Sequence, residues 1–278
     1  MTSDYLLYFF NIPGLSPTAL AGLFLLTLLR VGPIIGLAPF LGGRVTPVST
    51  RIGFAVILTF VFLPMVLSKA HHVELINFNW KFSLLAVKEL FLGFVLGFFV
   101  AIPFFIAQSS GILIDSMRGS SAMQAQDPTM QNQSSSIGNL FNYILIVLFF
   151  QIDGPFIFFD AFLKSYEVVP PDAFLSTKFF ALQMPLWTTG LSIMSHIIAL
   201  CVQLAAPALI AVLMTEVFLG IANRLAPQVQ ISFLGMSLKS LVGLLILWAG
   251  WFFILKQTSL ESLRWLNVFD KILYSWHP

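Results

Sequence analysis

The stretch FFALQMPLWTTGLSIMSHIIALCVQLAAPALIAVLMT, Phe179 to Thr215, runs for 37 residues without a formal charge. As one α-helix it would be about 55 Å long, whereas the hydrocarbon core of a bilayer is about 30 Å thick. A strand facing lipid would leave its backbone groups unpaired, so the stretch is predicted to be helical. It must therefore bend, pair back on itself or leave the bilayer, and the expected break points are Pro185, Gly190 and Pro207.

Apolar runs of this kind recur along the whole chain. Of 278 residues, 58% are hydrophobic, 9% are charged and thirty are Phe, whereas a soluble domain carries about 25% charged residues. Six runs are long enough to be membrane helices: Ala19 to Leu41, Ile52 to Leu67, Phe82 to Ala107, Leu140 to Leu163, Phe179 to Thr215 and Val229 to Leu255. The sequence therefore predicts an all-α membrane protein with a single membrane domain over residues 1–278. Its helices are expected to be long, bent and broken by Pro and Gly.

Charged side chains within the apolar runs indicate that the helices pack against one another or against other proteins. Each charge would cost about 2.5–3.5 kcal/mol at the centre of a helix that faces lipid. Five such residues lie within the runs or at their edges: Arg30, Asp153, Asp160, Glu216 and Lys239. The pairs Gly32-x-x-x-Gly36 and Gly93-x-x-x-Gly97 would let helices approach closely, although such spacings also arise by chance in a Gly-rich membrane protein.

One segment interrupts the apolar pattern. It is SSGILIDSMRGSSAMQAQDPTMQNQSSSIG, Ser109 to Gly138, and its only charges are Asp115, Arg118 and Asp127. A connection of this length is usually either functional or disordered. Regular structure is expected to break at four residues: Gly111, Gly119, Pro128 and Gly138.

The same segment is rich in soft, uncharged side chains. Its methionines, which are flexible and polarizable and can repack around varied surfaces, are Met117, Met123 and Met130. A neutral, soft lining suits a passage for polymers of unpredictable charge. The alternative is a disordered linker at the surface.

Three blocks of the chain resemble one family. They are LLRVGPIIGLAPFLGGRVTPVSTRIGFAVIL (residues 28–58), QSSGILIDSMRGSSAMQAQDPTMQNQSSSIGNLFNYILIVLFFQIDG (residues 108–154) and APALIAVLMTEVFLGIANRLAPQVQISFLGMSLKSLVGLLIL (residues 206–247). In this order they are similar to the signature blocks of the T subunit of the type III secretion export apparatus, the SctT/FliR family. The most specific set is Glu216, Gly220, Arg224, Ala226-Pro227-Gln228 and Lys239.

The resemblance implies an export gate rather than an enzyme, with no cofactor. One copy of this subunit is expected to join several copies of two smaller membrane subunits in a conical, helical assembly around a conduit. Other expected partners are the autocleaving switch protein, the large export-gate subunit, inner rod and needle components, and unfolded secreted proteins as cargo, with no nucleic acid. The expected location is the bacterial inner membrane, which the chain crosses several times within the base of the apparatus. The stretches DSMRG and FFQIDG…SYEVVPP look more like an injectisome than a flagellum.

By the same resemblance, residues 108–138 form a plug that holds the conduit shut. Met117, Met123 and Met130 would pack in the closed conduit, and Asp115 and Arg118 would form an ion pair if their turn is helical. Three charges are expected to hold hairpins and subunits together: Glu216, Arg224 and Lys239. The alternative interpretation is that these three residues are intramembrane charges that pair with neighbouring groups and have no part in transport.

Two other classes of function are weighed against the gate. A secondary transporter for a small solute would show internal repeats with corresponding broken helices, and residues 1–138 and 139–278 do not correspond. An intramembrane enzyme would need a convergent catalytic set, but Asp153 and Asp160 lie on one run without a matching partner. The sequence has no nucleotide-binding loop and no Cys/His cluster with metal-ligand spacing, so the energy for export must come from elsewhere.

Overall fold

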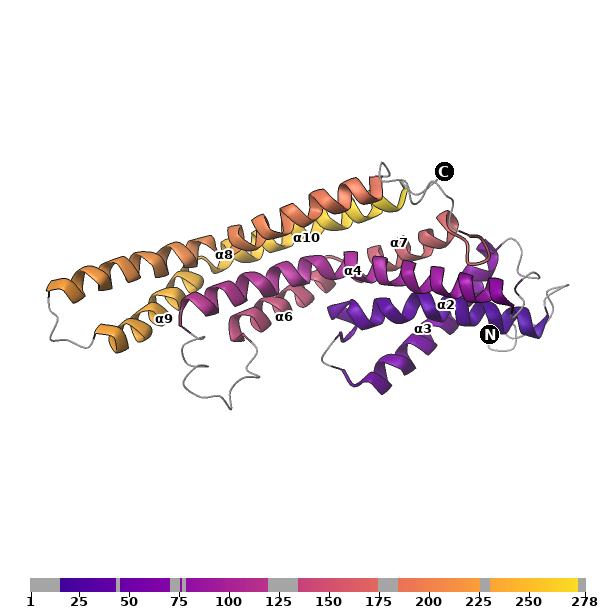
Figure 1. The fold of residues 1–278 in the computed structure, drawn as a ribbon, viewed down its shortest axis with the longest axis horizontal. Coiled ribbons are helices and arrows are strands. Elements are labelled where there is room, and N and C mark those ends of the chain that lie inside the picture. The colour runs from indigo at the N-terminus through magenta and orange to yellow at the C-terminus, as the bar shows by residue number, and fades with distance from the viewer. Residues whose placement is uncertain are drawn as a thin grey trace. The chain divides into compact units, whose positions relative to one another are not determined.

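The computed structural model is helical throughout the elements that it describes (Figure 1). It describes residues 16–43, 46–70, 76, 79–119, 135–174, 185–225 and 231–274, but only the backbone of 185–194, 231–234, 263 and 266–274. In chain order the elements are α2 (Pro17–Leu37), the 3₁₀-helix η1 (Pro39–Leu41), α3 (Val48–Lys69), α4 (Trp80–Met117), α6 (Ser136–Gln151), α7 (Gly154–Val168), α8 (Pro185–Leu225), α9 (Ile231–Ala249) and α10 (Trp251–Tyr274). The predicted all-α class is confirmed for this part of the chain.

Four helices are long and apolar enough to cross a membrane on their own. They are α2, α3, α4 and the part of α8 from Ser195 to Leu225. Two further pairs of helices, α6 with α7 and α9 with α10, are each bent at a short break and pass the same test together, which gives up to six spans if each bent pair is one span. The six apolar runs of the sequence thus correspond to four unbroken candidate spans and two bent pairs, and the chain is a multi-pass membrane protein.

The long uncharged stretch falls largely within one unbroken helix. α8 begins at Pro185 and continues for 41 residues, with Pro207 in its interior. Gly190 and Pro207 were expected to break this helix, but both lie inside it. Membrane helices tolerate an internal Pro where neighbouring groups satisfy the carbonyl that it frees. At about 60 Å, α8 is longer than a bilayer core is thick, so it tilts strongly or extends beyond the bilayer.

The chain divides into two compact units that alternate along the sequence. Unit 1 comprises Met1–Ala101, Asp153–Gly190 and Leu266–Pro278, and unit 2 comprises Ile102–Ile152 and Leu191–Trp265. Both α4 and α8 contribute residues to each unit. The single membrane domain over residues 1–278 stays a prediction.

Unit 1 packs α2 against the first part of α4 at two glycines. A Cβ atom at Gly93 would overlap the backbone carbonyl of Arg30, and one at Gly97 would lie 3.0 Å from the Cα atom of Ile34. The Gly93-x-x-x-Gly97 pair therefore allows the close helix contact that its spacing predicts. The Gly32-x-x-x-Gly36 pair does not make such a contact within the described residues, because a Cβ atom at either position would have nothing within 4 Å.

Aromatic rings fill the interior of unit 1 between α3 and α7. The rings of Phe62 and Phe162 have centroids 5.5 Å apart, and Phe162 meets Tyr166 edge to face at 5.3 Å. Offset and edge-to-face ring pairs add to the stability that their buried area provides. They fix α7 beside the other helices of the unit.

Unit 2 packs the second part of α4 against α6, again at glycines. A Cβ atom at Gly111 would lie 2.5 Å from the Cα atom of Gly138, and the rings of Phe104 and Phe149 meet 5.4 Å apart on the same two helices. The prediction that Gly111 and Gly138 break regular structure is wrong, because both lie inside helices and are needed there for contact. Gly119 does end a helix, since it follows α4 with a φ of 99°, a conformation that favours Gly.

The segment predicted as a loop is accordingly shorter than residues 109–138. α4 runs through Met117, and α6 begins at Ser136 after the N-cap Ser135, whose hydroxyl accepts a hydrogen bond from the Gly138 amide. Pro128 lies outside the described residues.

Alanine at Gly93 tests the contact between α2 and α4. We expect Gly93→Ala to lower the thermal unfolding midpoint, because the added methyl group must displace a backbone, and overpacking of this kind costs about 1–3 kcal/mol. Gly32→Ala is the matched control, since its Cβ atom enters open space and Ala is favoured over Gly within a helix by about 1 kcal/mol. Equal midpoints for the two purified variants in detergent would contradict the close approach.

Candidate functional site

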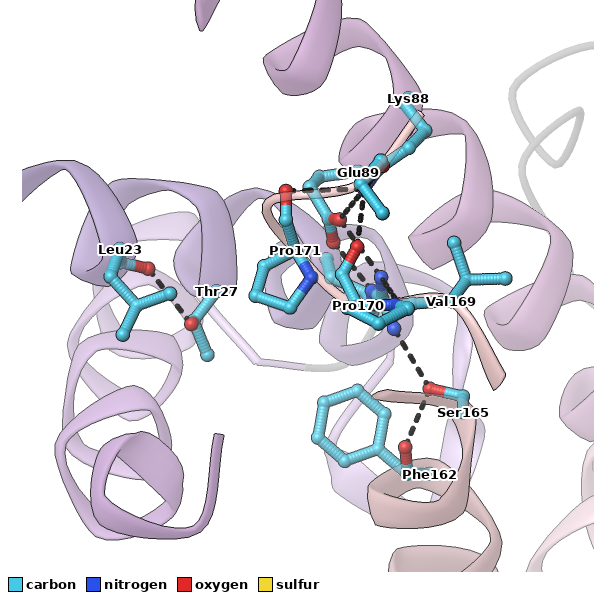
Figure 2. A network of polar contacts seen from close by, with 11 residues as sticks. Leu23, Thr27, Lys88, Glu89, Phe162, Ser165, Val169, Pro170 and Pro171 are labelled. Atoms are coloured by element: carbon cyan, nitrogen blue, oxygen red, sulfur yellow. Dashed lines mark hydrogen bonds and ion pairs between the residues drawn. The ribbon is translucent and has the colours of Figure 1, made fainter. Parts of the chain in front are cut away.

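A fully buried cluster of charges joins three helices of unit 1 (Figure 2). Arg30 of α2 donates from Nε to Oε2 of Glu89 on α4 at 2.5 Å and from Nη2 to Oε1 at 2.8 Å. Both side chains are completely excluded from solvent. The two parallel bonds form the bidentate arrangement that a guanidinium and a carboxylate favour. We refer to Arg30, Lys88, Glu89 and Ser165, with the carbonyls that they bind, as the Arg30 cluster.

The remaining donors of Arg30 bind α7 and the residue that follows it. Nη1 donates to the hydroxyl of Ser165 at 3.1 Å, and Nη2 donates to the carbonyl of Val169 at 2.9 Å. The Ser165 hydroxyl in turn donates to the Phe162 carbonyl. The guanidinium carbon also lies 3.9 Å from the centre of the Tyr166 ring, within cation–π range. One arginine therefore links α2, α4 and α7.

Lys88 provides a second buried cation in the same cluster. Its Nζ atom lies 2.8 Å from Oε1 of Glu89. It also donates to three backbone carbonyls that follow α7: those of Pro170 at 2.8 Å, Pro171 at 3.2 Å and Ala173 at 2.8 Å. Consecutive prolines cannot continue a helix, so these carbonyls lie beyond the backbone bonding of α7. Lys88 binds all three of them, and the Pro170 carbonyl also accepts from the Ala173 amide at 3.3 Å.

The cluster carries more positive than negative charge. Arg30 and Lys88 share the carboxylate of Glu89, and backbone carbonyl dipoles together with the nearby carboxylate of Asp172 offset the remaining positive charge. The carbonyls that receive Arg30 and Lys88 follow the C-terminal end of α7, where the helix dipole is negative and cations are favoured. Removing one partner of a buried ion pair typically costs about 3–5 kcal/mol, because the other charge stays buried and unpaired.

Only one member of this cluster is a site residue in the sequence prediction. Arg30 was expected to pack against other helices or subunits, and it lies at the centre of a contact between three helices of its own chain. Lys88, Glu89 and Ser165 were missed. The available signal was an adjacent pair of opposite charges, Lys88-Glu89, inside an apolar run with a single Arg in the first run.

The two predicted aspartates of unit 1 lie outside the cluster. Asp160 pairs with Lys164 of its own helix at 2.8 Å and is 66% exposed, so this contact does not join two helices. Asp153 occupies the break between α6 and α7 in a left-handed conformation with a φ of 57°, and no side-chain cap bond is formed. Their predicted part in packing between subunits stays a prediction.

In unit 2, Asp115 joins the end of α4 to the start of α6. Its Oδ2 atom accepts from the Ser135 hydroxyl at 2.6 Å and from the Ile137 amide at 2.9 Å. Its Oδ1 atom lies 3.1 Å from Nη1 of Arg118, so the predicted i,i+3 ion pair is present. A carboxylate at a helix N-terminus satisfies free amides and complements the dipole. These bonds hold the end of α4 beside the start of α6. We refer to the residues that form them, Asp115, Arg118, Ser135 and Ile137, as the Asp115 stem.

The Asp115 stem is connected to α9. Nη2 of Arg118 donates to the Ser240 hydroxyl at 2.7 Å. On the preceding residue, Lys239 pairs with Glu216 of α8 at 2.5 Å. The structure thus brings four predicted charges, Asp115, Arg118, Glu216 and Lys239, into contacts among the helices of unit 2.

Two of the other predicted residues of unit 2 lie near the ends of helices. Met117 lies in the last turn of α4 and is 36% exposed, and Arg224 lies exposed in the last turn of α8. Met123 and Met130 lie outside the described residues. Among the residues that the structure describes, no group of three His, Cys, Asp or Glu side chains could hold a metal ion.

Comparison with known proteins gives one family match and several relatives. Residues 21–262 match the family described as "Bacterial export proteins, family 1". The secretion system apparatus protein SsaT of Salmonella typhimurium is 29% identical over 82% of this chain and 84% of its own. The Yop proteins translocation protein T of Yersinia pestis is 32% identical over 59% of this chain and 61% of its own. The flagellar biosynthetic protein FliR of Escherichia coli is 27% identical over 78% of this chain and 79% of its own.

From the Arg30 cluster we predict that two glutamate substitutions in unit 1 lower the free energy of unfolding by very different amounts. Glu89→Gln removes the carboxylate that the buried cations Arg30 and Lys88 share, so we expect it to destabilise the protein by about 3–5 kcal/mol. Glu167→Gln removes the partner of Lys69 from an ion pair whose side chains are 43% and 50% exposed, and such pairs contribute about 0–1 kcal/mol. Denaturant unfolding of the purified variants would measure both. Equal destabilisation would show that the buried pair has no special role.

Proposed function

Since the chain belongs to the bacterial export proteins of family 1, the SctT/FliR family, we propose that it is a core subunit of a type III export gate. We further propose that residues 108–138 close the conduit of this gate. The chain is a multi-pass inner-membrane component of a type III secretion export apparatus, it acts in protein export, and its family consists of apparatus subunits rather than enzymes.

The Asp115 stem is the observation that carries the plug proposal. A segment that blocks a conduit must be held at both ends, or it would be pushed aside by any cargo. Asp115 binds both the residue after α4 and the first turn of α6, and Gly111 and Gly138 place these helices in direct backbone contact. The end of α4 and the start of α6 are therefore held close together.

The composition of the enclosed residues supports the same role. Between the ends of the stem, residues 119–134 contain one charge, Asp127, together with Met123, Met130 and many Ser and Gln. Uncharged, flexible side chains can seal against varied surfaces without binding any cargo strongly. The proposed gate is passive, so its opening requires force or energy from other parts of the apparatus.

An exposed face of unit 2 supports docking with partner subunits. On α8, Glu216 is 52% exposed beside Val217 at 58% and Phe218 at 65%. A half-exposed carboxylate next to apolar side chains is costly in lipid but well tolerated against protein. We propose that this face meets the two smaller export-gate subunits. Contact with the autocleaving switch protein, the large export-gate subunit, and rod and needle components rests on the family assignment alone.

An injectisome is the proposed setting. SsaT and the Yop proteins translocation protein T are 29% and 32% identical to this chain, and flagellar FliR of Escherichia coli is 27% identical. Cargo would then be unfolded secreted proteins.

Replacing the methionines of the plug tests the proposal. We expect the triple variant Met117→Gly, Met123→Ser and Met130→Ser to raise ion leakage across the membrane of cells that express the complete apparatus, because the seal loses its bulky side chains. The matched control is Met65→Ser on α3 in unit 1, which is 52% exposed and remote from the segment in sequence. Membrane conductance of the two variants, with assembly verified by co-purification, is the measurement. Unchanged conductance in an assembled triple variant would overturn the plug.

A further inference from the structure

Arg118 occupies a position between three described helices of unit 2. It follows the last residue of α4, and its guanidinium contacts Asp115 through Nη1 and Ser240 of α9 through Nη2. It is mostly buried, with 15% of its side chain exposed. A single side chain thus bonds the Asp115 stem on one side and α9 on the other.

The fold leaves room for Arg118 at one glycine of α9. A Cβ atom at Gly243 would lie 3.0 Å from Cδ of Arg118, 3.1 Å from its Cγ and 3.4 Å from Cγ2 of Val212 on α8. The aliphatic part of Arg118 therefore passes over Gly243, close to the place where α8 meets α9. Any larger side chain at position 243 would push this part of Arg118 away.

α8 and α9 are themselves joined beside this contact. Lys239, the residue before Ser240, pairs with Glu216 of α8. A displacement of α8 is therefore passed on to α9 at the same turn that holds Arg118. In the other direction, Asp115 receives Arg118 on one carboxylate oxygen and the first turn of α6 on the other.

We propose that the contact of Arg118 with Ser240 and Gly243 is a latch through which the α8–α9 hairpin controls the Asp115 stem. With the hairpin in place, Arg118 is held by Ser240 and keeps Asp115 oriented toward α6. When the hairpin moves, the bond to Ser240 breaks, Arg118 is released from α9, and Asp115 loses the charge that orients it. The physical basis is that a hydrogen bond to a charged, largely buried group contributes more than one between neutral groups.

The latch rests on the proposed function only for its effect on conductance. The coupling itself is a property of the described residues and can be measured without the plug. Arg118 is a positioning residue in this proposal, since it acts on α6 through Asp115 and contacts no cargo.

Hydrogen exchange at the start of α6 tests the coupling directly. Ser240→Ala removes the acceptor for Arg118 on another helix, and Ser237→Ala, an exposed serine of the same helix, is the matched control. We expect amides of residues 137–141 to exchange about tenfold faster in Ser240→Ala, as loss of one charge-assisted hydrogen bond predicts, and to be unchanged in Ser237→Ala. Equal protection of α6 in both variants would overturn the latch.

A stronger latch provides the opposite test. Ser240→Asp offers Arg118 a carboxylate, so we expect α6 to exchange more slowly than in the native protein if this variant folds. Gly243→Ala crowds Arg118 and should act in the same direction as Ser240→Ala. Faster exchange in a folded Ser240→Asp variant would contradict the proposed direction of control.

Ion leakage then separates failure of the latch from failure of the plug. If the triple methionine variant leaks and Ser240→Ala changes neither leakage nor exchange at α6, the plug stands and the latch is overturned. If Ser240→Ala speeds exchange at α6 while neither variant leaks, the latch stands and the plug is overturned. Both proposals together expect leakage in the triple methionine variant and in Ser240→Ala, and native conductance in the control Ser237→Ala.

Discussion

The buried guanidinium of Arg30 imposes the main constraint on unit 1. A permanent charge excluded from solvent must be surrounded by acceptors, and Arg30 meets this need with a carboxylate, a hydroxyl and a backbone carbonyl from two other helices. Lys88 adds a second cation, whose acceptors follow the end of α7. None of the three helices can separate without exposing an unpaired charge to an apolar environment. Gly93 lets α4 approach the backbone of Arg30, and the Tyr166 ring covers its guanidinium.

The charged contacts of unit 2 differ from the Arg30 cluster in how far they are buried. Its contacts among α4, α8 and α9 are less completely buried than the Arg30 cluster, with side-chain exposures of 15% and 11% for Arg118 and Asp115 and of 20% and 52% for Lys239 and Glu216. Partly exposed pairs have a smaller desolvation cost and a smaller cost of breaking. In the proposed export gate, the Arg30 cluster would hold the helices of unit 1 rigidly, and the contacts of unit 2 would be broken and formed again when the proposed plug opens.

Local rules predicted the helices well and their interruptions poorly. Apolar runs of membrane-spanning length indicated α2, α3, α4 and α8 because burial in lipid requires every backbone group to be paired within the helix. Gly190 and Pro207 were expected to break α8, and Gly111 and Gly138 to break α4 and α6, yet all four lie inside helices. Intrinsic preferences at Gly and Pro are weaker than packing: Gly111 and Gly138 are where two backbones touch.

The sequence by itself determined the membrane class, the helical content and the Asp115–Arg118 pair, because hydropathy and i,i+3 spacing act within a single helix. Only the tertiary structure decided that Arg30 pairs with Glu89 and that Arg118 reaches Ser240, since these partners are 59 and 122 residues apart. Composition signals that a buried charge needs a partner, but many carboxylates along the chain would satisfy that need equally. The choice among them is made by which helix faces meet, and this depends on the packing of the whole unit.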